Sequence, residues 1–338
     1  MAATLGMNRV SLAPGLRLRP AAWTDVDAVA KLILEVCTAD GDATVAVPPE
    51  ELRREWQTEG FTLEEDAWVI QDEQGRIVGY EECFNRHAHA VFQGDGYVHP
   101  DFAGQGIGTA LLRAMDGRAL ELREQAEPGL RVYIRNGLSA DDAAGRALHE
   151  AEGYQAIRYS WRMEIHLPDA PPVPVWPEGI ELRSFEVAKH NRMVFEAHEE
   201  AFSDHWGHTP GTFTRWQQRL TSGEEFDPSL WHIAWDGDQV AGYSLCRFRS
   251  GIGWVGTLGV RRPWRKRGLG MALLQHSFGE FHRRGMKIVS LGVDAANPTG
   301  ATRLYQKAGM QIAAQYVIYE KEYRPGREFE EESEIKPE

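Results

Sequence analysis

The sequence predicts an α/β (α+β) protein built from two similar domains in tandem. A β-like run at 254–260 leads into a Gly-rich turn at 265–270, and a helical pattern follows at 271–278. The same order occurs upstream, where Gly106 takes the place of Gly268 and Gly108 that of Gly270. The chain has 338 residues, which is enough for two domains of about 150 residues each.

The repeat covers most of both halves. Residues 96–112 align without gaps on 258–274, and 68–70 resemble 231–233. Its period is far longer than the roughly 20–50 residues of a solenoid unit, so we interpret it as a duplicated domain.

The elements of the first copy follow from periodicity and turn signals. Thr24 begins a helix in which Val29, Ile33 and Val36 recur at helical spacing. The other predicted elements are a strand at 16–19, a hairpin at 68–80, a helix at 107–122, a strand at 130–134, a helix at 140–151 and a closing strand at 159–165.

A proline-rich segment separates the copies. Prolines exclude helix and favour an extended spacer. The last strands predicted for the second copy are 288–294 and 316–323. We therefore expect an arm at 1–14, a first domain at 15–166, a linker at 167–178, a second domain at 179–324 and a charged tail at 325–338.

Composition excludes several classes of protein. The net charge of −13 argues against a nucleic-acid binder, which would need a basic face. The three cysteines are scattered and imply neither disulfides nor a metal site. Apolar runs stay shorter than the ~18 residues of a membrane span, and no signal-peptide core is seen. We expect a cytoplasmic protein with no membrane partner, either a monomer or a homodimer.

The turn at 265–270 has the chemistry of a pyrophosphate site. The first N–H groups of a helix lack partners inside the helix, and the helix dipole favours an anion there. Gly268 and Gly270 allow close approach, while Arg265 and Arg267 can add charge-assisted hydrogen bonds. The glycines match neither the dinucleotide pattern nor a P-loop.

These residues resemble the GNAT acyltransferase superfamily. Its signature Arg/Gln-x-x-Gly-x-Gly/Ala is matched by Arg265–Gly270, and Asn297, Ala301 and Leu304-Tyr305 with Gly309 match a second signature. The repeat is similar in architecture to the tandem type found in mycothiol synthase. The resemblance implies two domains, each with a mixed, mostly antiparallel sheet flanked by helices.

The resemblance also implies an N-acetyltransferase in which a small-molecule amine attacks acetyl-CoA directly, without a metal, in the C-terminal domain. Backbone groups of Leu258, Gly259 and Val260 would bind the thioester carbonyl and the pantetheine arm. The other residues expected to bind the cofactor are Arg265, Lys266, Arg267, Gly268, Leu269, Gly270, Met271, Asn297 and Tyr305. Tyr305 would protonate the departing thiolate.

The general base is expected in the acid- and histidine-rich stretch at 196–208. Asp204 and His205 are the main candidates there, and His198, Glu199 and His208 are alternatives. The acids of this stretch, with Glu224, Glu225 and Asp227, suggest an acceptor site for a cationic amine, although solvated helix faces would explain them equally well. Some of Trp206, Trp216, Trp231, Trp235 and Trp254 are expected to line the acceptor pocket and the others to be core.

The N-terminal copy departs from the signature. Ala103, Gln105 and His149 stand where Arg265, Arg267 and Tyr305 stand in the second copy. We expect a degenerate, mainly structural domain, with weak CoA binding or a second activity as alternatives. For the whole chain, the alternatives to a small-molecule acetyltransferase are a non-catalytic acyl-CoA sensor or scaffold and a protein N-terminal or lysine acetyltransferase.

Overall fold

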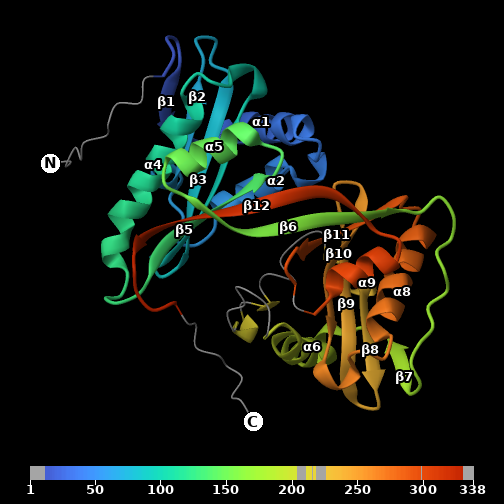
Figure 1. Ribbon diagram of the computed structural model, residues 1–338. Helices are drawn as coiled ribbons and strands as arrows, with labels where there is room; N and C mark the ends of the chain where they lie inside the picture. Colours follow the sequence, from blue (N-terminus) through green and yellow to red (C-terminus); the bar gives the residue numbers. More distant parts are fainter. Residues whose placement is uncertain (1–11, 204–210, 215, 218–225, 298, 330–338) are drawn as a thin grey trace. The chain divides into compact units, whose positions relative to one another are not determined.

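The computed structural model describes residues 12–203, 211–214, 216–217, 226–297 and 299–329 (Figure 1). These residues form two compact units. The first contains the chain up to Arg158 together with Tyr316–Phe329, and the second contains Tyr159–Gln315. In the described part of the chain, no helix has both the length and the apolar character that crossing a membrane requires.

The first unit is a sheet whose strands follow the order β1-β2-β3-β4-β5-β12. Neighbouring strands are antiparallel except β4 and β5, which are parallel. The strands are β1 (Arg17–Pro20), β2 (Ala67–Gln71), β3 (Ile77–His87), β4 (Val91–Val98), β5 (Val132–Ser139) and β12 (Gln311–Arg324).

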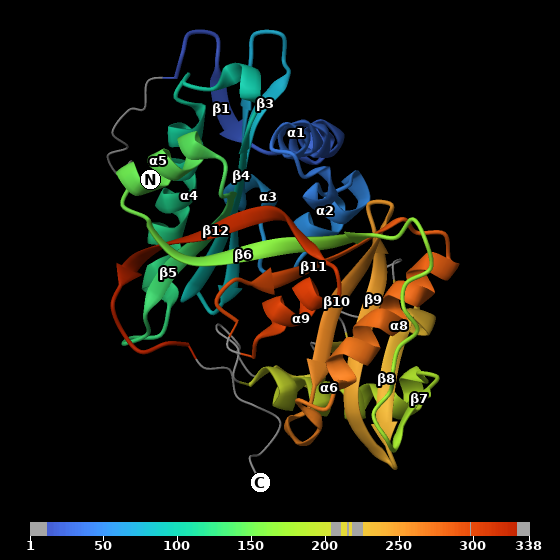
Figure 2. The same ribbon diagram turned by 45° about the vertical axis from the view of Figure 1, so that its right-hand side comes forward.

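Helices cover both faces of this sheet because successive strand residues point to opposite sides. The helices α1 and α2 lie on one side of the sheet and α4 on the other (Figure 2). Val69 packs in the core with α1 and α2, whereas Ile70 packs with α4. The helices are α1 (Val26–Ala39), α2 (Pro49–Trp56), α3 (Leu63–Asp66), α4 (Ile107–Leu122) and α5 (Ala143–Ala151).

The second unit repeats this plan with the strand order β6-β11-β10-β9-β8-β7, in which only β10 and β11 are parallel. Ile233 packs with α6 on one face, and Ala234 packs with α8 on the other. The elements are β6 (Gln155–His166), β7 (Ile180–Arg183), α6 (Val187–Phe202), β8 (Trp231–Asp236), β9 (Gln239–Arg249), β10 (Ile252–Val260), α8 (Leu269–Arg283), β11 (Ile288–Asp294) and α9 (Ala301–Lys307). The mixed, mostly antiparallel sheets with flanking helices confirm the predicted fold class.

Each unit takes a strand that the sequence repeat places in the other. Residues 160–166 of β6 pair with β11, and 316–324 of β12 pair with β5. Val317 and Tyr319 are fully buried in the core of the first unit, and Met163 is fully buried in that of the second. This corrects the expectation that 159–165 closes the first domain and that 316–323 belongs to the second.

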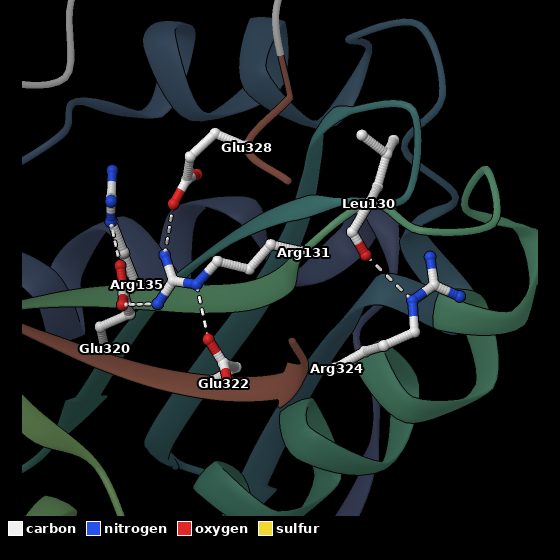
Figure 3. A network of polar contacts seen from close by, with 7 residues as sticks. All are labelled: Leu130, Arg131, Arg135, Glu320, Glu322, Arg324 and Glu328. Carbon is white, nitrogen blue, oxygen red and sulfur yellow. Dashed lines mark hydrogen bonds and ion pairs between the residues drawn. The ribbon is translucent and has the colours of Figure 1, made fainter. Parts of the chain in front are cut away.

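Ion pairs connect β12 and the segment after it with β5 and the residue before it (Figure 3). The Arg131 guanidinium lies 2.6 Å from Glu322 and 3.0 Å from Glu328, and Arg135 lies 2.8 Å from Glu320. Glu322 and Glu328, which pair with Arg131, are exposed, and such pairs contribute about 0–1 kcal/mol each, whereas Glu320 is only 10% exposed. The ion pairs therefore favour the pairing register of β12, while the buried side chains supply most of its stabilisation.

Candidate active site

A cavity opens in the second unit where β10 and β11 separate. The two strands pair only through Gly253 with Val289 and Trp254 with Ser290, and a bulge follows in β10 between Val255 and Thr257. Residues 255–260 of β10 and 291–294 of β11 line the cavity, whose volume is about 1230 Å³. Since β9 pairs with the other edge of β10, the edge at 258–260 that faces β11 is open to a ligand.

The turn before α8 lies at this cavity, and its backbone forms a concave cradle. Lys266 has a φ of 63°, and Gly268, the N-cap of α8, has a φ of 88°. A Cβ at Gly268 would contact nothing within 4 Å, so the approach to the helix N-terminus is open. Positive-φ turns of this kind present successive N–H groups to an anion. Residues 268–271 all line the cavity.

Arg265 stabilises this turn through hydrogen bonds to backbone carbonyls. Its Nε donates to the carbonyl of Val260 at 3.1 Å, and its Nη2 donates to the carbonyl of Ala201 at 3.0 Å. These bonds connect the end of β10, the end of α6 and the turn. Lys266 and Arg267 are exposed and line the same cavity. The three cations thus differ in their surroundings, and Arg265 has a positioning role that the sequence did not predict.

Tyr305 lines the cavity from α9. It is 8% exposed, and burial raises the pKa of its hydroxyl to about 12. A phenol with this pKa keeps its proton at neutral pH and can act as a donor. Nearby, Asn297 Oδ1 accepts hydrogen bonds from the Thr299 amide at 2.9 Å and from its hydroxyl at 2.6 Å, which shapes the loop before α9.

All the residues predicted to bind the cofactor line this one cavity. They are Leu258, Gly259, Val260, Arg265, Lys266, Arg267, Gly268, Leu269, Gly270, Met271, Asn297 and Tyr305. Residues up to 47 positions apart in the sequence therefore meet around one space, as expected for a strand, a turn and a second helix of one domain.

Tyr243 lies directly behind the cavity wall at Gly259, and the sequence did not predict this role. It is fully buried on β9, and its hydroxyl lies 3.1 Å from His198 Nδ1 of α6. A Cβ at Gly259 would come within 2.4 Å of that hydroxyl, so only glycine fits opposite Tyr243. Burial, together with the nearby Glu199 and Glu200, raises the pKa of Tyr243. The only sequence signal was the repeated Gly-Tyr pair at 79–80 and 242–243.

The main candidates for the general base, Asp204 and His205, lie outside the described residues, as do His208, Glu224 and Glu225. The described acids of the expected acidic pocket already have partners. Glu200 pairs with Arg261 at 2.5 Å, Glu196 with Arg192 at 3.1 Å and Asp227 with Arg284 at 2.7 Å, and Glu199 accepts from the Gly211 amide at 3.2 Å. Arginines balance the charge of three of these carboxylates, and none of the four lines the cavity, so the described residues lend no support to a strongly acidic acceptor site.

The tryptophans proposed for the acceptor pocket are core residues where the structure describes them. Trp216, Trp231, Trp235 and Trp254 are at most 9% exposed. Trp206 lies outside the described residues. Trp216 packs against Phe195 of α6, and its indole donates to Asn191 at 3.0 Å. Trp231 and Trp235 belong to the same core, on the sheet face that α6 covers.

The turn of the first unit has the same backbone shape but different side chains. Gly104 and Gly106 have φ values of 76° and 83°. His149, at the position of Tyr305, lies with Nε2 2.9 Å from the Asn136 amide nitrogen and Nδ1 2.8 Å from the Gly145 carbonyl. A neutral ring protonated on Nδ1 satisfies both contacts, and burial lowers the pKa of His149. The side chain thus has internal partners on both nitrogens.

Within the described ranges, no group of three His, Cys, Asp or Glu side chains gathers in a way that could hold a metal ion.

Comparisons with known proteins place both units in one family. A model described as "Acetyltransferase (GNAT) family" matches residues 191–310, and one described as "Acetyltransferase (GNAT) domain" matches 64–156. A mycothiol acetyltransferase of Thermomonospora curvata is 32% identical over 75% of this chain and 81% of its own. Another, from Catenulispora acidiphila, is 28% identical over 88% and 95%.

Solved structures agree. A GCN5-related N-acetyltransferase from Sphaerobacter thermophilus superposes with a TM-score of 0.82 at 38% identity, covering 94% of this chain and 99% of its own. A tandem GNAT protein from the clavulanic acid biosynthesis pathway has a TM-score of 0.69 at 18% identity, covering 92% and 99%, which shows that the fold is shared.

Proposed function

The chain belongs to the GNAT acetyltransferase family, and we propose that its second unit transfers an acetyl group from acetyl-CoA to the primary amine of a small molecule. The observation that carries this proposal is the single cavity that gathers the anion-binding turn, the open edge of β10 and the Tyr305 hydroxyl. The turn suits a pyrophosphate, the open strand edge suits a pantetheine arm, and the hydroxyl can protonate a departing thiolate.

The helix N-terminus at 268–271 would hold the pyrophosphate, because its N–H groups and dipole favour an anion. Lys266 and Arg267 would add charge from the cavity rim, and Arg265 would keep the turn in place through its bonds to Val260 and Ala201. The pantetheine arm would then run along 258–260, where its amides can pair with the strand edge as an additional strand would.

Transfer would proceed by direct attack. The amine nitrogen bonds to the thioester carbonyl carbon, and a backbone N–H at the open edge of β10 stabilises the oxyanion. As the C–S bond breaks, Tyr305 donates its proton to the sulfur, and the phenolate is reprotonated with the proton that the attacking nitrogen loses. Asp204 or His205 remains our proposal for the group that removes this proton, directly or through water.

The relatives named mycothiol acetyltransferases favour a small-molecule acceptor over a protein. A non-catalytic acyl-CoA sensor is the second candidate, because the turn and strand edge would bind the cofactor without any base. Release of free thiol from acetyl-CoA across a library of primary amines separates the two. The enzyme should release thiol in proportion to an acetylated amine, and Tyr305→Phe should suppress it. Cofactor binding without amine-dependent release would support the sensor.

A further inference from the structure

The cavity continues beyond the turn to a wall that the GNAT signature does not include. Val175, Trp176 and Pro177 of the linker line it, as does Gln275 on the second turn of α8. The linker runs beside α8 on its way to β7 (Figure 2). All these residues belong to the second unit.

Packing against the protein core holds the Trp176 side chain in this position. It packs on a cluster that includes Trp264, Leu269 and Leu273, and its ring meets His276 at 5.9 Å and 60°. Its neighbours differ: Val173 and Val175 are 85% and 83% exposed, while Trp176 is half-buried. The surrounding prolines restrict the backbone. Trp176 is thus an aromatic side chain held at the cavity before any ligand binds.

The two ends of the cavity lie on opposite flanks of α8. Tyr305 packs in the core cluster that contains Leu274 and Phe278, whereas Trp176 packs in the one that contains Leu269 and Leu273. The pyrophosphate site at 268–271 is between them. If the thioester lies at Tyr305, the part of the cofactor beyond the pyrophosphate, which is the adenosine 3′-phosphate, has the Trp176 flank available to it.

We propose that Trp176 is a binding residue for the adenosine end of CoA, so that the linker of the tandem repeat forms part of the cofactor site. The inference rests on the proposed function. A purine presents a flat π-face, and an indole edge or face can pack on it. Replacing an aromatic residue that stacks on a base by alanine typically weakens binding about five- to 150-fold. Lys266 and Arg267 are exposed residues of the turn itself and line the same cavity, so their charges can attract the phosphates.

The test uses titration calorimetry of the full chain with three probes: acetyl-CoA, adenosine 3′,5′-bisphosphate and 4′-phosphopantetheine. Trp176→Ala should weaken acetyl-CoA and the bisphosphate about tenfold and leave 4′-phosphopantetheine unchanged. Trp176→Phe should restore much of the loss because it keeps an aromatic ring. Val173→Ala, in the same linker but 85% exposed and outside the cavity lining, is the matched control and should bind all three probes like the wild type.

Unchanged affinity of folded Trp176→Ala for the bisphosphate would overturn the inference while leaving the acetyltransferase intact. An equal loss for all three probes would also overturn it, because it would mean that Trp176 only supports the turn. A wild-type chain that binds neither acetyl-CoA nor 4′-phosphopantetheine would refute the proposed function itself.

Discussion

Tyr319→Ala should destabilise the first unit, although residue 319 lies near the end of the chain and within the second sequence repeat. The side chain is fully buried among residues of β4, β5 and α4, and its hydroxyl donates to Glu150 at 2.7 Å. Truncating a buried aromatic to alanine costs about 3–5 kcal/mol. That is a large share of the roughly 5–15 kcal/mol that stabilises a typical domain.

Hydrogen exchange followed by mass spectrometry locates the effect. A loss of about 3 kcal/mol corresponds to roughly a 150-fold faster exchange of amides that open with the unit. Peptides from β5 and α4 should lose protection, and peptides from β8 to β10 should keep theirs. Ile312→Ala is the control, because Ile312 lies on the same strand but is 40% exposed and belongs to the second unit. Loss of protection in β10 and β11 with β5 unaffected would refute the assignment of this strand.

Three further predictions concern the site and the first unit. Tyr305→Phe should lower kcat about 10²–10⁴-fold and change KM for acetyl-CoA little, since the proton is donated only as the thiolate leaves. Steady-state thiol release measures both constants, and a kcat within about twofold of wild type would mean that Tyr305 only packs in the core. Arg265→Ala should weaken acetyl-CoA binding and also lower Tm, because two hydrogen bonds to backbone carbonyls are lost. Titration calorimetry and thermal melting measure the two effects, and weaker binding at an unchanged Tm would mean that Arg265 acts on the ligand alone. Burial raises the pKa of Asp95 to about 6 and of Glu55 to about 7, so the folded first unit binds protons that the unfolded chain releases near pH 4. The free energy of unfolding of this unit should therefore fall as pH rises from about 4 to about 7 and stay low above pH 7. Urea denaturation at a series of pH values measures this, and the opposite slope would contradict the prediction.

Several elements could be predicted because their signals are local. The helix predicted at 107–122 has the bounds of α4, and the strand-turn-helix at 254–278 contains its strand, both glycines and the start of its helix in one contiguous stretch. Backbone freedom at glycine, helical spacing of apolar residues and the unpaired N–H groups of a helix end act within about ten residues. The turn and its chemistry could therefore be predicted from the sequence alone.

The tertiary structure decided which distant segments meet. Residues 159–165 and 316–323 have equally good strand patterns, and only burial of Met163 in one core and of Val317 and Tyr319 in the other decides their units. Likewise, Arg265 donates hydrogen bonds to the carbonyls of Val260 and Ala201, which are 5 and 64 residues away in the sequence. The Tyr243 side chain fits because the residue opposite it is Gly259. A period-2 pattern shows that a strand is buried on one or both faces, but it carries no information about which neighbour pairs with its edge. Sheet pairing and side-chain fit are non-local, so they are settled only when the whole unit packs.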